Sequence, residues 1–131
     1  MNPFEITEDR VRAGLGSTDN NVLVPAAQAV FAAAARAGAA FDGLEGLAVE
    51  QAADAGLSAL RPLSAEWPQQ LDGEGAEFGV VVLELLAEAA EGLSAAGRRT
   101  AEPAAVLSLH RAADDARATA EALNALVATA A

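Results

Sequence analysis

The sequence contains no cysteine and no lysine, and aromatic residues make up only 4% of the chain. Without cysteine the chain forms no disulfide bond and offers no thiolate to a metal or a substrate, so its redox compartment stays open. All eight basic residues are arginine, which together with the many alanines is typical of a GC-rich genome. Because large side chains are scarce, we expect a core built from closely spaced helices.

Basic residues are also few, with 8 against 19 acidic residues and a net charge of -11. Such a surface repels nucleic acids and anionic membranes, so neither is expected as a partner. It suits a basic protein partner, or it simply keeps the chain soluble. Hydrophobic residues still make up 53%, which argues against disorder. At 131 residues, the chain has the length of one domain, which we assign to residues 1–131.

Targeting segments are not expected. The stretch from Met1 to Arg12 is charged and acidic, whereas a signal peptide is basic and then apolar. The run from Val80 to Leu83 is too short to span a bilayer and leads into Glu84. We therefore expect a cytoplasmic protein, for which any export would need a route without a cleaved leader.

The spacing of apolar residues predicts an all-α protein with about five helices in a mostly antiparallel bundle. The expected helices span residues 7–13, 22–37, 42–60, 76–96 and 103–128. Val80 to Leu83 alone would pass for a buried strand, but the long periodic continuation after it favours a helix. We expect the second, fourth and fifth helices to form the core.

The last helix carries the clearest pattern in the chain. Its apolar residues recur at intervals of three and four, which places them on one face. They are Val106, Leu109, Ala113, Ala116, Ala120, Leu123 and Val127. Because three of the seven are alanine, another helix could approach closely, either from the rest of the chain or from another protein.

The third helix is the weakest of the five. Four leucines at helical spacing, Leu44, Leu47, Leu57 and Leu60, suggest its apolar face. Glycine lowers helix stability relative to alanine, and this segment contains three. The three glycines weaken this segment enough for the helix to break near Gly56.

Among candidate catalytic residues, His110 is the only histidine and precedes Asp114 by one helical turn. A histidine and a carboxylate can exchange protons with a substrate. No serine, cysteine or second histidine stands at a spacing that would complete a nucleophile system. A structural pair at the helix boundary is therefore favoured over a catalytic one, and no cofactor is expected.

Four glutamates form a stripe along the fourth helix: Glu77, Glu84, Glu88 and Glu91. A di-iron bundle needs a Glu-x-x-His motif on each of two helices, which one histidine cannot supply. We therefore expect no metal. The stripe is interpreted as a solvated face, with contact to a basic partner as the alternative.

The single tryptophan, Trp67, lies in the loop that precedes the fourth helix. It could cover the end of the bundle as an apolar plug, or it could be an exposed anchor for a partner. The plug is the favoured interpretation.

Trp67 and the segment Leu109 to Asp115 together resemble the helical substrates of actinobacterial type VII secretion, of the WXG and EspC-like kind. Those proteins have a tryptophan at a helical-hairpin turn and an aromatic–x-x-x–acid signal near the C-terminus. Here Pro68 follows the tryptophan and His110 stands where a tyrosine is usual. The resemblance implies a small helical protein exported with a helical partner, with His110 and Asp114 in the export signal.

The sequence thus favours a non-enzymatic module that binds another protein, or itself, through helical faces. Such a module could be a secretion substrate, an adaptor or a small structural subunit. The alternative is an acidic inhibitor or immunity-type protein that covers a basic enzyme surface with the glutamate stripe and the Trp67 loop. A small enzyme that uses His110 and Asp114 is the third hypothesis.

Overall fold

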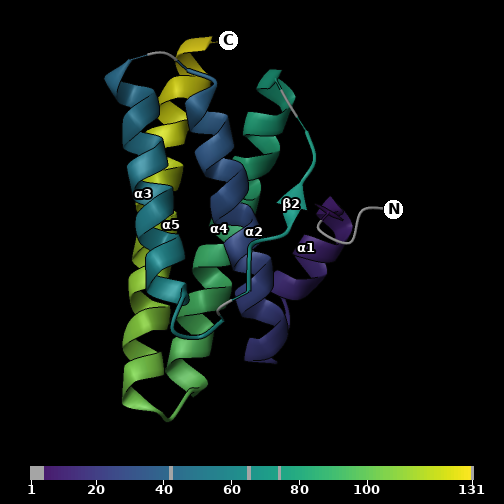
Figure 1. Cartoon of the computed structure of the whole chain (residues 1–131), viewed down its shortest axis with the longest axis vertical. Helices are drawn as coiled ribbons and strands as arrows, with labels where there is room; N and C mark the ends of the chain where they lie inside the picture. The colour runs from purple at the N-terminus through teal and green to yellow at the C-terminus, as the bar shows by residue number, and fades with distance from the viewer. Residues whose placement is uncertain (1–4, 42, 65, 74, 131) are drawn as a thin grey trace.

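The computed structural model describes residues 5–41, 43–64, 66–73 and 75–130. Figure 1 shows the elements, which follow one another as β1 (Glu5–Ile6), α1 (Glu8–Leu15), α2 (Asn20–Ala39), α3 (Leu44–Leu60), β2 (Gln70–Leu71), α4 (Gly75–Arg99) and α5 (Pro103–Ala130). The helices pack against one another, which confirms the predicted all-α bundle.

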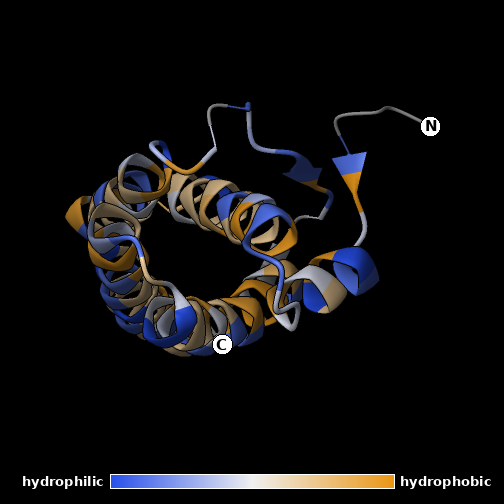
Figure 2. Ribbon diagram, turned by 90° about the horizontal axis from the view of Figure 1, so that it is seen from below, coloured by the Kyte–Doolittle hydropathy of each residue, from blue (hydrophilic) through white to orange (hydrophobic). Residues whose placement is uncertain are grey.

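The long helices α2 to α5 form a ring. Helices α2 and α5 each pack against both α3 and α4. In Figure 1, α2 and α5 run upward while α3 and α4 run downward, so neighbouring helices in the ring are antiparallel. Figure 2 looks along the bundle and shows the ring, with α1 and β1 outside it. The predicted core of α2, α4 and α5 is therefore incomplete, because α3 is a full member of the ring.

The predicted apolar stripe of α5 is hidden inside the protein. Leu109, Ala113, Ala116 and Leu123 are fully buried. The other members of the stripe are half-buried. Helices α3 and α4 of the same chain pack over this stripe. This stripe is therefore used for folding and is not a surface that a partner could reach.

The predictions for α4 and α3 have opposite outcomes. Val80 to Leu83 lie within α4, as predicted. Helix α3 is continuous through Gly56, so the expected break is wrong. The expected apolar face is right for Leu57 and Leu60, which pack in or against the core, and wrong for the two leucines of the first turn. Leu44 is 80% exposed and Leu47 is 45% exposed. The buried face of α3 consists of Gly46, Val49, Ala53, Gly56 and Leu60.

Small residues on α3 allow its backbone to approach α2 closely. A Cβ atom at Gly46 would lie 2.6 Å from the carbonyl oxygen of Gly38 on α2. A Cβ atom at Gly56 would overlap the ring of Phe31, which is itself fully buried on α2. Bulkier side chains would force the two helices apart, because packed interiors have almost no spare volume. The glycines of α3 are thus contact points between helices.

A long connection joins α3 to α4, because these two helices run in the same direction. The described parts of this connection, residues 61–64 and 66–73, lie along the outside of the bundle past α2 (Figure 1). Within the connection, β2 pairs with β1 as a short parallel ladder, in which Glu5 faces Gln70 and Ile6 faces Leu71. The sequence analysis does not predict this ladder. The buried Gln28 of α2 also donates to the carbonyl of Ser64 at 3.1 Å.

By length and composition, α2 is the one described helix that could cross a membrane. In the bundle, 67% of the apolar window in α2 is buried by the rest of the chain. A core helix meets the same length and composition criteria as a membrane span.

Replacing Gly56 with alanine tests the close approach of α2 and α3. We expect the variant to lose up to about 2 kcal/mol of unfolding free energy, because overpacking against Phe31 costs about 1–3 kcal/mol and the better helix propensity of alanine returns roughly 1 kcal/mol. Urea unfolding followed by circular dichroism measures the change. Ser58→Ala, at an exposed position of the same helix, is the control and should be neutral or slightly stabilising. A more stable Gly56→Ala variant would show that the ring of Phe31 does not rest on this glycine.

Candidate protein-binding cleft

The residues singled out in the sequence do not meet in one place. Three of the four glutamates, Glu77, Glu84 and Glu88, lie on the side of α4 that faces α1 and β1. His110 and Asp114 lie on α5, and Trp67 lies in the connection between α3 and α4. The glutamate stripe is therefore the part of the prediction that leads to a site.

The glutamate stripe is largely exposed to solvent, and two of its members also bind Arg12. Arg12 lies on α1, whose first turn is fixed by Thr7, because the Thr7 hydroxyl accepts from the backbone N–H of Arg10. The guanidinium donates to Glu84 at 2.8 Å and to Glu88, and its Nε donates to Glu8 at 2.9 Å. This ion-pair cluster ties α1 to α4.

The cluster holds one cation among three carboxylates. The hydrogen bond to Glu8 is the largest cause of a raised pKa for Arg12, and the hydrogen bond to Glu84 is the next. The Arg12 side chain is 30% exposed, so solvent weakens each pair. A local excess of negative charge remains around Arg12, and it continues toward the start of α4.

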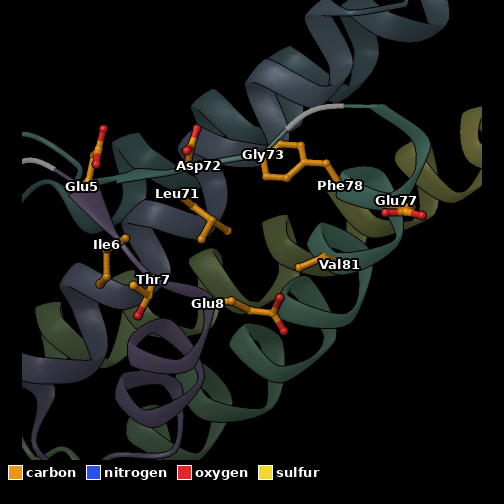
Figure 3. Close-up of a pocket in the computed structure, with 10 residues that line it drawn as sticks. All are labelled: Glu5, Ile6, Thr7, Glu8, Leu71, Asp72, Gly73, Glu77, Phe78 and Val81. Carbon is orange, nitrogen blue, oxygen red and sulfur yellow. The ribbon is translucent and has the colours of Figure 1, made fainter.

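Next to this cluster lies a cleft of about 440 Å³, bounded by β1, the start of α1, β2 and the start of α4. We call it the acidic cleft. Figure 3 shows the ten residues that line it: Glu5, Ile6, Thr7, Glu8, Leu71, Asp72, Gly73, Glu77, Phe78 and Val81. Four of them are carboxylates and none is basic.

The floor of the acidic cleft is apolar. Leu71 and Phe78 are almost fully buried, while Ile6 and Val81 are half-buried. In Figure 3, the side chains of Leu71 and Val81 point into the space between the strands and α4, and Glu8 reaches from α1 toward Val81. An apolar floor with a charged rim can hold a group that carries a cation on an aliphatic stem.

Arg36 of α2 holds one wall of the cleft in place. Its guanidinium lies 5.2 Å from the centre of the Phe78 ring, and it donates to the carbonyl of Leu71 at 2.7 Å. A longer bond, of 3.4 Å, reaches the carbonyl of Gly73. These contacts fix β2 and the start of α4 relative to α2. The wall is therefore supported from inside by a residue that does not line the cleft.

His110 and Asp114 do not form the pair that their spacing suggests. Asp114 is exposed and accepts from Arg117 at 3.1 Å. His110 is half-buried and packs against α4, where a Cβ atom on Gly97 would lie 2.7 Å from its Cε1 atom. No hydrogen bond joins the two side chains among the described residues. His110 thus sits at the crossing of α4 and α5.

The favoured interpretation of Trp67 is wrong. Its side chain is 84% exposed, so it does not plug the bundle. It lies beside a second cleft of about 380 Å³ that includes Leu57 and Arg61 of the α3 end. The connection around it joins helices that run in the same direction and is not a tight hairpin turn. The resemblance to secretion substrates stays a prediction.

Several residues of the acidic cleft escape sequence reasoning. Glu5 and Ile6 reach it only because β1 pairs with β2, and two-residue strands leave no periodic pattern. Phe78 lies on the buried face of α4 and serves both the core and the cleft floor. Within the described residues, no three His, Asp or Glu side chains gather in an arrangement that could hold a metal ion.

Replacing Arg12 with glutamine tests the ion-pair cluster. We expect a lower melting temperature, because three carboxylates would face one another without a cation, and added salt should reduce the loss by screening them. Arg117→Gln is the control, since it breaks a pair with an exposed carboxylate and should change stability little. Thermal unfolding at low and high salt measures the melting temperatures of both variants. An equal loss at the two salt concentrations would mean that Arg12 acts through packing alone.

Asp115 provides a prediction on pH. Partial burial, followed by the neighbouring charge of Asp114, raises its pKa above the ordinary 3.8, while Arg111 opposes the shift. The folded protein thus binds a proton at Asp115 more readily than the unfolded chain does. The contribution of Asp115 to the free energy of unfolding therefore increases as the pH falls through its raised pKa.

Asp115→Asn should therefore raise the melting temperature at neutral pH, by the equivalent of about 0.5 kcal/mol or less after solvent screening. The gain should vanish below the pKa of the unfolded chain, where the aspartate is protonated in both states. Glu121→Gln, which removes one charge at an exposed position of the same helix, is the control and should bring no such gain. Melting temperatures of the variants across the acid range test the direction of this effect. A lower melting temperature of Asp115→Asn at neutral pH would contradict it.

Comparison of the chain with models of known protein families, with curated proteins and with solved structures finds no match.

Proposed function

We propose that the protein is a non-enzymatic interaction module that binds a basic segment of another protein in the acidic cleft. The observation that carries this proposal is the combination of four rim carboxylates with an apolar floor. Charge complementarity favours a cationic partner and speeds its approach. The apolar floor adds short-range affinity for the part of the partner that reaches it.

Other surfaces support this role less well. The alanine-lined stripe of α5 is covered by the chain itself, so a partner helix cannot use it without opening the bundle. Self-association through the acidic cleft would bring together two copies that each carry a net charge of -11. We therefore infer a different protein as the partner.

An inhibitor that covers a broad basic surface is a narrower form of the same proposal. It would need the whole glutamate stripe to face the partner. Glu84 and Glu88 are already engaged by Arg12, which leaves Glu77 at the cleft and Glu91 further along α4. The stripe thus offers a partner one carboxylate at the cleft and one outside it in place of a continuous acidic face, which favours recognition of a segment over coverage of a wide face.

Binding of a fluorescein-labelled basic amphipathic peptide, followed by fluorescence anisotropy, tests the proposal. We expect Glu77→Gln and Asp72→Asn each to weaken binding by about two- to fivefold, the range expected for a partly exposed ion pair. Affinity should fall as salt rises from about 0.05 to 0.5 M. The control is Glu91→Gln, which removes one charge from the same helix outside the cleft.

Equal losses in the Glu77 and Glu91 variants would show that only the overall charge attracts the peptide. Binding that is indifferent to salt and to all three substitutions would contradict the proposal. Circular dichroism of each variant confirms that the bundle is intact, because Glu77 lies in the first turn of α4 and favours that helix end.

A further inference from the structure

Residues 5–15, which comprise β1 and α1, lie outside the ring of long helices. We call this segment the N-terminal arm. The ring closes without it, because α2 and α5 each pack against both α3 and α4. Figure 2 shows the arm against one side of the ring. The arm is therefore an addition to a bundle that is already closed.

A small set of contacts holds the arm on the ring. Its apolar contribution includes Val11, which is fully buried, and Leu15, which is almost fully buried. Its polar contribution includes the ion pairs of Arg12 with Glu84 and Glu88 and the two-residue ladder between β1 and β2. The ion pairs are partly exposed, so salt weakens them.

Helix α1 depends on these contacts for its existence. It has 8 residues, and an isolated helix of that length is not stable in water, because its first turn costs more than the few later hydrogen bonds return. The ring helices have 17 to 28 residues and bury their apolar faces against one another. Loss of docking thus unfolds α1 while the ring remains, which makes the arm a cooperative unit of its own.

The turn that follows the arm is anchored to the ring separately. The Arg99 guanidinium, at the end of α4, donates to the carbonyl of Ser17 and to Oδ1 of Asn20, both at 3.3 Å. The side-chain amide of Asn20 donates to the Thr100 hydroxyl at 3.0 Å. These bonds hold the start of α2 whether or not the arm is docked. Gly16, which joins the arm to this turn, is therefore the point about which the arm can move.

We propose that the N-terminal arm opens and closes on the ring as one unit, and that its docking assembles the acidic cleft. Four of the ten residues that line the cleft belong to the arm: Glu5, Ile6, Thr7 and Glu8. Opening of the arm removes this side of the cleft and leaves the side formed by α4 and β2 (Figure 3). The inference goes beyond the proposed function, because it concerns how the cleft forms and is independent of the group that fills it.

Native-state hydrogen exchange of the ¹⁵N-labelled full chain tests this inference. In low urea, we expect the amides of residues 11–16 to exchange through one shared opening, with protection at least about tenfold below that of the buried α5 residues Leu109, Ala113 and Ala116. Salt at about 0.5 M should lower the protection of the arm relative to α5, because it screens the pairs of Arg12. Equal protection and equal urea dependence in the arm and α5 would overturn the inference, since the arm would then open only when the whole chain unfolds.

Gly92→Ala loosens the arm selectively. The added Cβ atom would lie 2.5 Å from the carbonyl oxygen of Leu15, so the backbone of the arm must move away from α4. Its other close contact, at 3.1 Å, is with the Cδ1 atom at the end of the Leu23 side chain. We expect the protection of residues 11–16 to fall about tenfold relative to α5, because a packed contact has almost no spare volume. An arm whose protection does not fall would overturn the inference, since docking would then not control its exchange.

Gly79→Ala is the matched control on the same helix. Its Cβ atom would lie 3.1 Å from Cγ2 of Val127 on α5, away from the arm. Both substitutions raise the helix propensity of α4, so the control separates that effect from the contact with the arm. Protection of residues 11–16 relative to α5 should stay unchanged in Gly79→Ala. Equal losses of arm protection in the two variants would contradict docking through Gly92.

Binding in the cleft must be linked to the arm. A ligand that binds only the docked state raises the protection of the arm by the factor 1 + [L]/Kd, which is about tenfold at a free concentration of about ten times Kd. We expect this rise with the fluorescein-labelled basic amphipathic peptide. Peptide binding that leaves the protection of residues 11–16 unchanged would overturn the assembly of the cleft by the arm. Absence of peptide binding would instead remove the proposed function, while exchange in the free protein still decides whether the arm opens.

Discussion

The close approach of helix backbones is the constraint on which this structure depends. With few aromatic residues, the ring of helices is filled largely by alanine and medium-sized aliphatic side chains. A core of this kind has full packing density only where the backbones come near one another. Gly38 and Gly46 bring α2 and α3 together, and Gly97 admits His110 between α4 and α5. The helical glycines, which cost local stability, are thus required by the packing.

The acidic cleft is a consequence of the order in which the helices are connected. Because α3 and α4 run in the same direction, the chain between them must return along the bundle, and its described parts, residues 61–64 and 66–73, lie on the outside (Figure 1). Gln28 and Arg36 of α2 hold this connection, and β1 pairs with its second half. The strand side of the cleft therefore comes from segments that are not needed to close the ring, whereas its other wall belongs to the ring helix α4.

Large side chains at helical spacing made α4 and α5 predictable from the sequence, and the hidden stripe of α5 follows from that pattern. The same reasoning failed for α3, because it ranks Leu44 and Leu47 above Gly46 and Gly56 as core residues. In this helix, glycine is buried where only a very small residue fits against α2. A hydrophobicity scale does not identify such positions. The glutamate stripe lies on the face of α4 that carries the ion pairs with Arg12. Its pairing with Arg12, more than seventy positions away in the chain, leaves no local signal.

The acidic face of α4 serves stability at one end and, in our proposal, recognition at the other. At the Arg12 end the carboxylates are engaged within the chain, and the pairs hold α1 against α4. At the Glu77 end the carboxylates surround apolar surface. The net charge of -11 acts over about a Debye length and attracts any cation, so it cannot distinguish partners. Discrimination between cationic partners must therefore come from short-range contacts. The acidic cleft beside Arg12 can supply them, because its described residues combine carboxylates with apolar surface.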